Sequence, residues 1–152
     1  MPAPNKLRVY LDNCCFNRPF DDQQQLRIRL ETEAKLAIQQ YVLDKKLELA
    51  WSYMLDFENT ANPFELRRIH IESWCRHAIV NIVENPVIIE QAEALARLGL
   101  RNKDALHVAC AMAMRCDYFL TTDDRILHKA GSINAIAVSD PINFIKVLLY
   151  ND

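Results

Sequence analysis

The stretch Leu-Arg-Val-Tyr-Leu-Asp-Asn, residues 7–13, sets the fold of this chain. It is a short apolar, β-prone run that stops at Asp12 and Asn13, as a buried first strand does at the edge of a sheet. Similar short runs predict further strands over residues 47–51 (LELAW), 118–121 (YFLT) and 135–138. The sequence therefore predicts four short strands.

Helical patterns fill the intervals between these strands. In residues 23–44 apolar side chains recur every three or four positions, which predicts an amphipathic helix. Ser52 is the expected N-cap of the next helix, and Gly99 the expected end of a later one. A third helix is expected to open at Pro63 and to carry Leu66, Ile69, Trp74 and Ile79, and Asn102 is the expected N-cap of a later one. Residues 16–22 are expected to form a loop. The other expected helices are residues 23–44, 53–61, 87–98, 104–115, 125–129 and 141–150. This alternation predicts an α/β fold with a parallel sheet.

The composition indicates a single globular domain, residues 1–152. Of the 152 residues, 51% are hydrophobic and 25% charged, which is enough for one buried core. The longest apolar stretches, such as 105–114 and 144–150, are much shorter than the roughly 20 residues of a membrane span. Residues 1–7 lack the apolar core of a secretory signal. We expect a soluble cytoplasmic protein with no membrane contact.

Cysteine and glycine usage narrows the chemistry. The five cysteines are an odd number without a CxxC pair, so we expect reduced thiols rather than a zinc site. The chain has two glycines and neither GxGxxG nor GxxxxGK[ST], which weakens any nucleotide-cofactor interpretation.

Four acidic residues stand where strands give way to helices or in the early turns of helices: Asp12, Glu58, Asp104 and Asp123. The carboxyl ends of parallel strands meet at one edge of a sheet, so these distant residues are expected to converge. Each also has an ordinary structural explanation. Asp12 suits a turn cap, and Asp104 complements the dipole of its helix.

Two of the assignments involve a choice between neighbouring acids. Glu58 is preferred to Asp56, because Asp56 points roughly 160 to 200 degrees away on the same helix and is expected to be solvated. Asp123 is preferred to Asp124, which is expected to cap the following helix or face solvent. Thr122 is expected to orient a carboxylate or a water molecule.

Four carboxylates cannot remain ionised together without cations. Hard oxygen ligands, without a histidine pair or thiolate cluster, select Mg²⁺ or Mn²⁺ over zinc. The chemistry that follows is phosphodiester hydrolysis, in which bound metal makes a water molecule acidic enough to attack phosphorus and no side-chain nucleophile is needed. His107 either hydrogen-bonds Asp104 or packs as a core histidine, and we expect support rather than metal ligation.

The charge balance agrees with a polyanionic substrate once the acids are bound to metal. The 18 basic and 20 acidic residues give a net charge of −2, which argues against a general nucleic-acid coat protein. Setting the four acids aside leaves 18 minus 16, or +2. Arg18 in the loop after Asp12 is a candidate phosphate contact, as are Arg101, Lys103 and Arg125, although each is also an ordinary surface charge.

Four stretches together resemble the PIN-domain family: VYLDNCCFNRPFDD (residues 9–22), WSYMLDFENTANP (51–63), NKDALHVACAMA (102–113) and YFLTTDDRIL (118–127). The match covers essentially the whole chain. It implies a three-layer α/β/α fold with a short central parallel sheet and a metal site made by Asp12, Glu58, Asp104 and Asp123. Asn13, where many relatives carry Thr or Ser, is placed in a supporting position.

The resemblance also implies an activity and partners. PIN domains are Mg²⁺- or Mn²⁺-dependent ribonucleases, and many, including the VapC type, are toxins of bacterial toxin–antitoxin pairs. We therefore expect an RNA substrate, an antitoxin protein and a homodimer. The apolar residues Phe57, Phe64, Ile69 and Trp74 suit core packing, a dimer face or an antitoxin groove.

Two other interpretations remain open from the sequence. One is a catalytically silent PIN-like domain that binds RNA or another protein. The other is a receiver-like signalling module, which also gathers acids and Mg²⁺ at a sheet edge but needs a lysine near the last strand end. Residues 138–140 (Val-Ser-Asp) offer none.

Overall fold

The centre of the protein is a five-stranded sheet, all parallel, in the spatial order β3-β2-β1-β4-β5. The computed structural model describes residues 6–151, so residues 1–5, part of the amino-terminal stretch considered above, and residue 152 lie outside it. In the middle strand, Tyr10 is in register with Ala50 of β2 and Phe119 of β4. The strands are β1 (Arg8–Leu11), β2 (Glu48–Ser52), β3 (Val80–Ile82), β4 (Tyr118–Leu120) and β5 (Ala137–Ser139).

The chain changes direction across the sheet between β1 and β4. It first adds β2 and β3 on one side of β1, then returns to add β4 and β5 on the other side. Such a switch point is where open parallel sheets bind ligands, beyond the carboxyl ends of the strands. A receiver-like module has the order 2-1-3-4-5, so the receiver-like interpretation is wrong.

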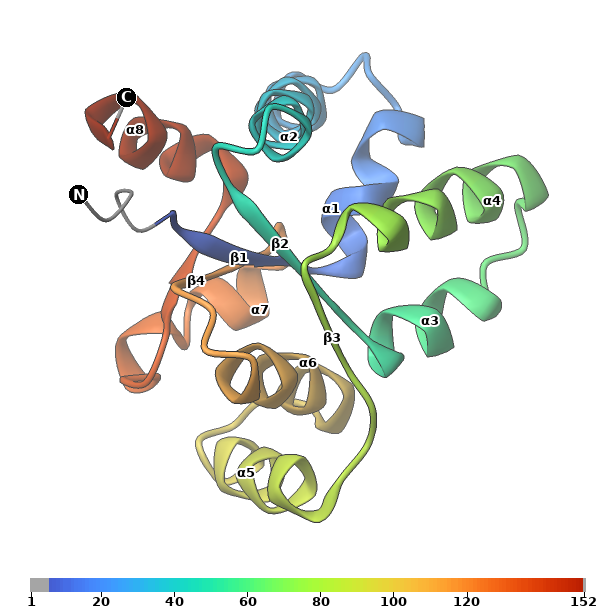
Figure 1. Ribbon diagram of the computed structural model, residues 1–152. Helices are drawn as coiled ribbons and strands as arrows, with labels where there is room; N and C mark the ends of the chain where they lie inside the picture. The colour runs from blue at the N-terminus through green and yellow to red at the C-terminus, as the bar shows by residue number, and fades with distance from the viewer. Residues whose placement is uncertain (1–5, 152) are drawn as a thin grey trace.

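Helices cover both faces of the sheet (Figure 1). On one face α2 (Leu26–Leu43) packs against α8 (Pro141–Asn151), and on the other α5 (Pro86–Arg97) packs against α6 (Asn102–Ala113). The predicted three-layer α/β/α fold is therefore confirmed. The remaining helical elements are α1 (Asn13–Asn17), η1 (Arg18–Phe20), α3 (Tyr53–Thr60), α4 (Glu65–Ser73), η2 (Trp74–His77), α7 (Asp124–Leu127) and η3 (Ala130–Ser132). Within the described residues, none of the helices has the length and apolar character needed to cross a bilayer.

The middle strand is buried on both sides, which explains its nearly continuous apolar sequence. Val9, Tyr10 and Leu11 are fully buried. The Tyr10 ring stacks on Phe119 with the ring centroids 5.4 Å apart, and Phe16 meets Trp51 edge-on at the same distance. These contacts fix the strand end that precedes Asp12.

The segment after β1 differs from the prediction of a loop over residues 16–22. It forms the five-residue helix α1 and the short turn η1. Asp12 begins α1 by accepting a 2.8 Å hydrogen bond from the N–H of Asn13. A helix this short has no apolar periodicity to reveal it in the sequence.

The helix predicted to run through Ile79 also ends early. α4 begins at Glu65, after Pro63, and ends at Ser73; the chain then forms η2 and the edge strand β3. β3 has three residues and exists through its pairing with β2, so local pattern alone did not predict it. The Asn102 prediction is wrong by one position, because Asn102 is the first residue of α6 and Arg101 occupies the N-cap.

Two other predicted helix boundaries are confirmed. The Ser52 hydroxyl accepts a 3.4 Å hydrogen bond from the N–H of Leu55 at the start of α3. Gly99 follows α5 with a φ of 105°, a conformation that glycine adopts without a steric cost.

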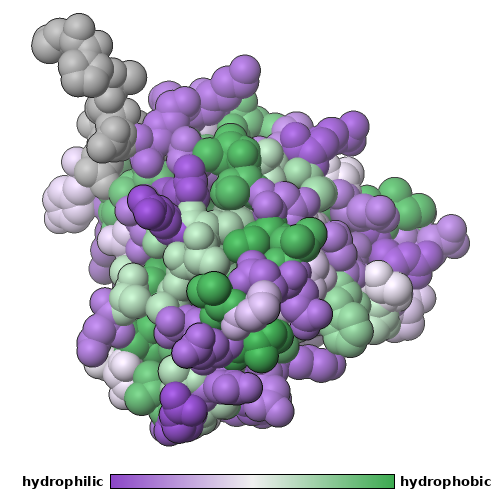
Figure 2. Space-filling view, turned by 60° about the horizontal axis from the view of Figure 1, so that its bottom comes forward, coloured by the Kyte–Doolittle hydropathy of each residue, from purple (hydrophilic) through white to green (hydrophobic). Residues whose placement is uncertain are grey.

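Hydrophobic side chains reach the surface in several places. Figure 2, which views the molecule from the side of α5, shows hydrophobic patches among polar residues. Of the four apolar residues left open by the sequence, Trp74 is buried and belongs to the core. Phe57, Phe64 and Ile69 are 59%, 59% and 54% exposed, so they are surface residues.

Candidate functional site

The structure brings all four predicted acids to one cavity. Asp12, Glu58, Asp104 and Asp123 line a cavity of about 620 Å³. Asp12 directly follows β1, and Asp123 lies just beyond β4, so the cavity opens at the switch point of the sheet. Its other lining residues are Asn13, Cys14, Phe57, Ala61, Arg101, Asn102 and Lys103.

Asp12 is held by hydrogen bonds from both sides. The Thr121 hydroxyl donates to Oδ2 at 2.8 Å, and the N–H of Asn13 donates to Oδ1 at 2.8 Å. Burial raises the pKa of Asp12 above its ordinary value, although the nearby His107 and the Thr121 hydrogen bond act in the opposite direction. Asp12 is therefore a carboxylate for which a bound cation would offset a burial cost.

Glu58 is held by a buried chain of hydrogen bonds. His107 Nε2 lies 2.6 Å from Glu58 Oε1, and His107 Nδ1 lies 2.6 Å from the Tyr10 hydroxyl. That hydroxyl in turn lies 2.6 Å from Ser52 Oγ. The partner of His107 is thus Glu58 and not Asp104, because the ring points across to α3 rather than along its own helix.

The pKa values of this pair move in opposite directions. Burial alone would raise the pKa of Glu58, but its hydrogen bond with His107 lowers it below the ordinary value. Burial alone would lower the pKa of His107, but the bond with Glu58 and the charge of Asp12 raise it. Glu58 therefore stays ionised beside the cavity.

Asp104 and Asp123 share one arginine. Arg101 Nε lies 3.1 Å from Asp104 Oδ2, and Arg101 Nη2 lies 3.2 Å from Asp123 Oδ2. Asp123 also accepts a 2.9 Å hydrogen bond from the N–H of Arg125 and caps α7. Of the two places expected for Asp124, the helix cap is taken by Asp123, whereas exposure to solvent is confirmed, since the Asp124 side chain is 55% exposed. Asp124 makes an ion pair with Arg27, 2.7 Å apart, which lowers its pKa.

The supporting residues fall partly where the sequence placed them. Asn13 lines the cavity beside Asp12. Thr122 is buried, but its Oγ1 has no hydrogen-bond partner among the described residues, whereas the preceding Thr121 makes the bond to Asp12 and accepts one from the N–H of Asp123. The expected orienting role on a carboxylate thus belongs to Thr121.

Two of the predicted phosphate contacts, Arg18 and Arg125, do not line this cavity. Arg125 still lies beside it, with Nε 3.5 Å from Asp123 Oδ1, whereas Arg18 is held elsewhere. Its guanidinium pairs with the buried Glu31 at 2.9 Å and with Asp21 at 2.9 Å. Residues absent from the prediction take part instead, namely Thr121, Tyr10 and Ser52. The adjacent threonines carried a signal for the first of them, but local sequence did not say which of the two faced the acids.

The family model described as PIN domain matches residues 9–132. This chain belongs to the PIN-domain family. Among solved structures, this PIN domain is similar to a chain of VapBC2 from Rickettsia felis, determined bound to a DNA fragment from their promoter. The identity is 12% and the TM-score 0.55, with 88% of this chain and 98% of that chain covered.

A second solved structure gives the same picture of the fold. This PIN domain is similar to a chain of VapBC-1 from nontypeable Haemophilus influenzae, at 12% identity and a TM-score of 0.54, covering 89% of this chain and 98% of that chain. At this identity the two structures show a shared fold. A comparison with curated protein sequences gave no match.

The cavity of this PIN domain has the donor chemistry of a divalent-metal site, since its acidic lining residues supply hard oxygen ligands. As the side chains are arranged, no group of three or more His, Cys, Asp or Glu among residues 6–151 is placed to hold a metal ion. Two of the carboxylates face Arg101 instead. The residue types fit the metal, and the arginine occupies part of their coordinating capacity.

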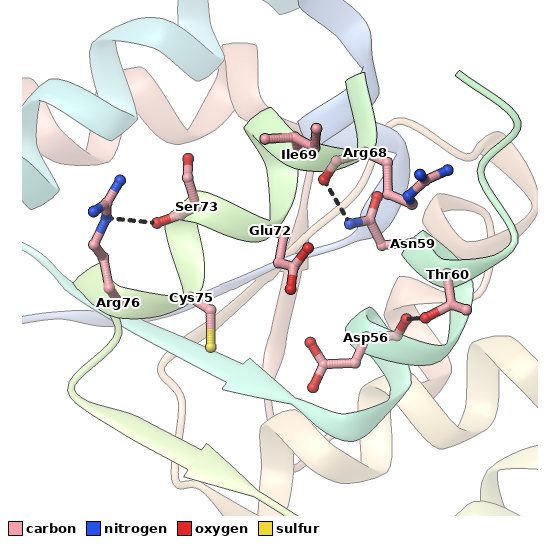
Figure 3. A pocket seen from close by; sticks show the side chains of 9 residues that line it. All are labelled: Asp56, Asn59, Thr60, Arg68, Ile69, Glu72, Ser73, Cys75 and Arg76. Carbon is pink, nitrogen blue, oxygen red and sulfur yellow. Dashed lines mark hydrogen bonds between the residues drawn. The ribbon is translucent and has the colours of Figure 1, made fainter. Parts of the chain in front are cut away.

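Another cavity of the PIN domain, of about 1000 Å³, lies between α3 and α4 and contains none of the predicted acids. Figure 3 shows Asp56 on α3 and Glu72 on α4 at its two sides. Asp56 is exposed, as predicted, but it also accepts a 2.9 Å hydrogen bond from Trp51 Nε1. Asp56 and Glu58 therefore serve different sites, as expected from their angular separation on the helix.

Proposed function

We propose that this PIN domain is a divalent-metal-dependent endoribonuclease of the VapC type, which hydrolyses RNA phosphodiester bonds with Mg²⁺ or Mn²⁺. One observation carries this proposal: carboxylates from four distant segments, Asp12, Glu58, Asp104 and Asp123, line a single cavity at the switch point of the sheet.

Asp12, Glu58, Asp104 and Asp123 would hold the metal. A bound divalent cation supplies an activated water and neutralises charge on the phosphate and leaving oxygen. The protein's own hydrogen bonds restrict the motion of two ligands before any ion binds, through Thr121 at Asp12 and His107 at Glu58. Preorganised ligands lower the cost of ordering the site at the moment of binding.

The cavity also offers groups suited to single-stranded RNA. Lys103 Nζ lies 5.6 Å from the centre of the exposed Phe57 ring, and both residues line the cavity. An exposed ring beside a cation can stack a splayed base while the cation meets the backbone. Arg101 and Arg125, near Asp104 and Asp123, are the other candidate phosphate contacts.

We further propose that the enzyme is the toxin of a toxin–antitoxin pair, that it works in the cytoplasm and that it forms a homodimer. Its fold is shared with chains from VapBC2 and VapBC-1, which supports a VapB-type antitoxin as partner. The exposed Phe57, Phe64 and Ile69 supply apolar surface for a partner chain.

The test is cleavage of single-stranded RNA by purified protein, with Mg²⁺ or Mn²⁺ and with EDTA. We expect cleavage that requires the metal and falls at least about 100-fold in Asp12→Asn and Asp104→Asn, because each loses a charged ligand oxygen. Asp56→Asn is the matched control and should retain activity, since Asp56 lines the other cavity. Unchanged turnover in folded Asp104→Asn protein would refute the assignment.

The same experiment separates the silent alternative. A catalytically silent PIN-like domain would bind RNA in a filter or fluorescence assay but cleave none with either metal. In that case the acid substitutions would leave RNA binding unchanged or strengthen it, because they remove negative charge.

A further inference from the structure

Arg101 is placed between two of the cavity's carboxylates and contacts both at once. Its Nε is 3.1 Å from Asp104 Oδ2 and its Nη2 is 3.2 Å from Asp123 Oδ2. The two acids come from different elements, the first turn of α6 and the N-cap of α7. The planar guanidinium group of Arg101 thus links two segments of the chain that line the cavity.

Among residues 6–151, neither of the other two acids of the cavity makes an ion pair with an arginine or a lysine. Asp12 is bound by the Thr121 hydroxyl and a backbone N–H, and Glu58 by His107. Asp104 and Asp123 are therefore the pair that arginines of the chain neutralise: Arg101 contacts both, and Arg125 Nε lies 3.5 Å from Asp123 Oδ1. The oxygens that Arg101 contacts are the kind of ligand that a divalent cation takes, so the arginine and an ion compete for them.

Few other contacts hold the Arg101 side chain against Asp104 and Asp123. Arg101 occupies the N-cap position of α6, yet its side chain makes no capping hydrogen bond. The side chain is 54% exposed, so the guanidinium is already partly hydrated and gains water contacts when it leaves the two carboxylates. Ion pairs whose arginine reaches the surface are weaker than fully buried ones and are screened by salt, which suits a group that an ion replaces.

We propose that Arg101 is a built-in counter-ion of the acidic cavity. It neutralises Asp104 and Asp123 in the metal-free protein, and a divalent cation must displace it, so that Arg101 lowers the affinity for metal. This inference rests on the proposed metal-dependent function and adds a residue that determines metal affinity.

The test measures Mn²⁺ binding to the whole chain without RNA, by the loss of the electron paramagnetic resonance signal of free Mn²⁺. We expect Arg101→Ala to bind Mn²⁺ roughly three- to tenfold more tightly than wild type, the range expected when one or two weak ion pairs no longer compete. Arg29→Ala removes the same charge from an exposed position on α2 and should leave the affinity unchanged.

Arg101→Lys distinguishes the effect of one guanidinium contacting two carboxylates from the effect of a positive charge at this position. Lysine keeps the positive charge but lacks the planar fork that meets two carboxylates together, so we expect tighter binding than wild type. If Arg101→Lys equals wild type and Arg101→Ala alone binds more tightly, long-range charge explains the effect and the counter-ion proposal is wrong. Arg101→Lys also keeps the proposal testable if Arg101→Ala does not fold.

The outcomes distinguish this inference from the proposed function. If wild-type protein binds Mn²⁺ and both Arg101 variants bind it equally or less tightly, the inference fails while the nuclease proposal stands. If none of the proteins binds Mn²⁺, both fail. A thermal melt supplies a second readout: Arg101→Ala should gain more stability from Mn²⁺ than wild type does, and an equal gain would count against displacement.

Discussion

His107 contacts Glu58 from the interior of the protein, with Nε2 2.6 Å from the carboxylate oxygen Oε1, although the two residues are 49 positions apart in the chain. The opposite ring nitrogen lies 2.6 Å from the Tyr10 hydroxyl. Since the imidazole is fully buried, it has no alternative partner in water. The orientation of Glu58 therefore depends on residues in the core as well as on α3.

Tyr10→Phe tests this dependence. The substitution keeps the ring that stacks on Phe119 but removes the hydroxyl shared by His107 and Ser52. We expect the free energy of unfolding to fall by about 1 to 3 kcal/mol, the cost of leaving buried polar groups unpaired, when measured by urea unfolding at pH 7. Tyr118→Phe is the control, because the Tyr118 ring packs on Phe144 and its hydroxyl makes no hydrogen bond to any residue from 6 to 151. Equal stability of the two variants would contradict the buried chain.

Thr121→Val tests the support of Asp12. Thr121 donates to Asp12 at 2.8 Å and accepts from the N–H of Asp123 at 3.1 Å, so valine removes one contact to each of two predicted ligands. Loss of such support around a metal ligand typically lowers affinity or activity by about 10- to 100-fold. We expect a drop in that range for Mn²⁺ affinity and for cleavage.

Thr122→Val provides the matched comparison at the next residue. The Thr122 hydroxyl is buried without a hydrogen-bond partner among the described residues, so its loss removes no contact and no metal support. We expect wild-type cleavage and stability within about 1 kcal/mol of wild type. A large loss in Thr122→Val together with a small one in Thr121→Val would reverse the assignment.

These threonines show where sequence reasoning reached its limit. The positions of Asp12 and Asp123 at strand ends followed from two short apolar runs, because parallel strands bring their carboxyl ends to one edge. Which of two adjacent hydroxyls faces the acids depends on the rotation of β4, and that rotation is set by packing against β1 and β5. The local sequence therefore does not predict which of the two threonines contacts Asp12.

Long-range partners were the other missing information. The sequence placed His107 three residues after Asp104 on one helix, and local spacing suggested that pair. The observed partner is Glu58, because α3 and α6 pack against each other. Likewise Arg18 was predicted near phosphate from its closeness to Asp12, but α2 places Glu31 against it. Tertiary packing outweighed sequence distance in both cases.

Glu31→Ala tests the network that holds Arg18. The Glu31 side chain is 2% exposed and accepts from Arg18 at 2.9 Å and from Arg27 at 3.3 Å. Removing it leaves the partly buried Arg18 without its buried partner, and breaking a buried ion pair on one side costs up to about 3 to 5 kcal/mol. We expect a loss of about 2 to 3 kcal/mol in urea unfolding, since both arginines are partly exposed and keep other acidic partners. Glu33→Ala, an exposed position on the same helix, should change stability by less than about 0.5 kcal/mol.

Lys35 is a buried cation with no hydrogen-bond partner for its Nζ among the described residues. Its side chain is 1% exposed and lies 5.5 Å from the Phe16 ring centre and 5.9 Å from that of Trp74. Burial lowers the pKa of Lys35 from 10.5 to about 8. A shift of this size corresponds to about 3 kcal/mol of lost stability at pH 7, where the unfolded chain holds the proton more tightly, and contacts with the two rings return about 1 kcal/mol of it.

Lys35→Met should therefore stabilise the protein by about 2 kcal/mol at pH 7. The folded pKa of Lys35 lies below the unfolded value, so the unfolded state binds the extra proton between about pH 8 and 10.5, and the stability of wild type rises with pH across that window. The stability gained by Lys35→Met is thus full below about pH 8 and mostly gone by pH 10.

Urea unfolding of wild type and Lys35→Met at pH 7 and pH 10 measures how this gain in the free energy of unfolding depends on pH. The control is Lys146→Met, at an exposed position. A gain that is the same at both pH values would mean that Lys35 is not titrating in the folded protein, and that its substitution acts through packing alone.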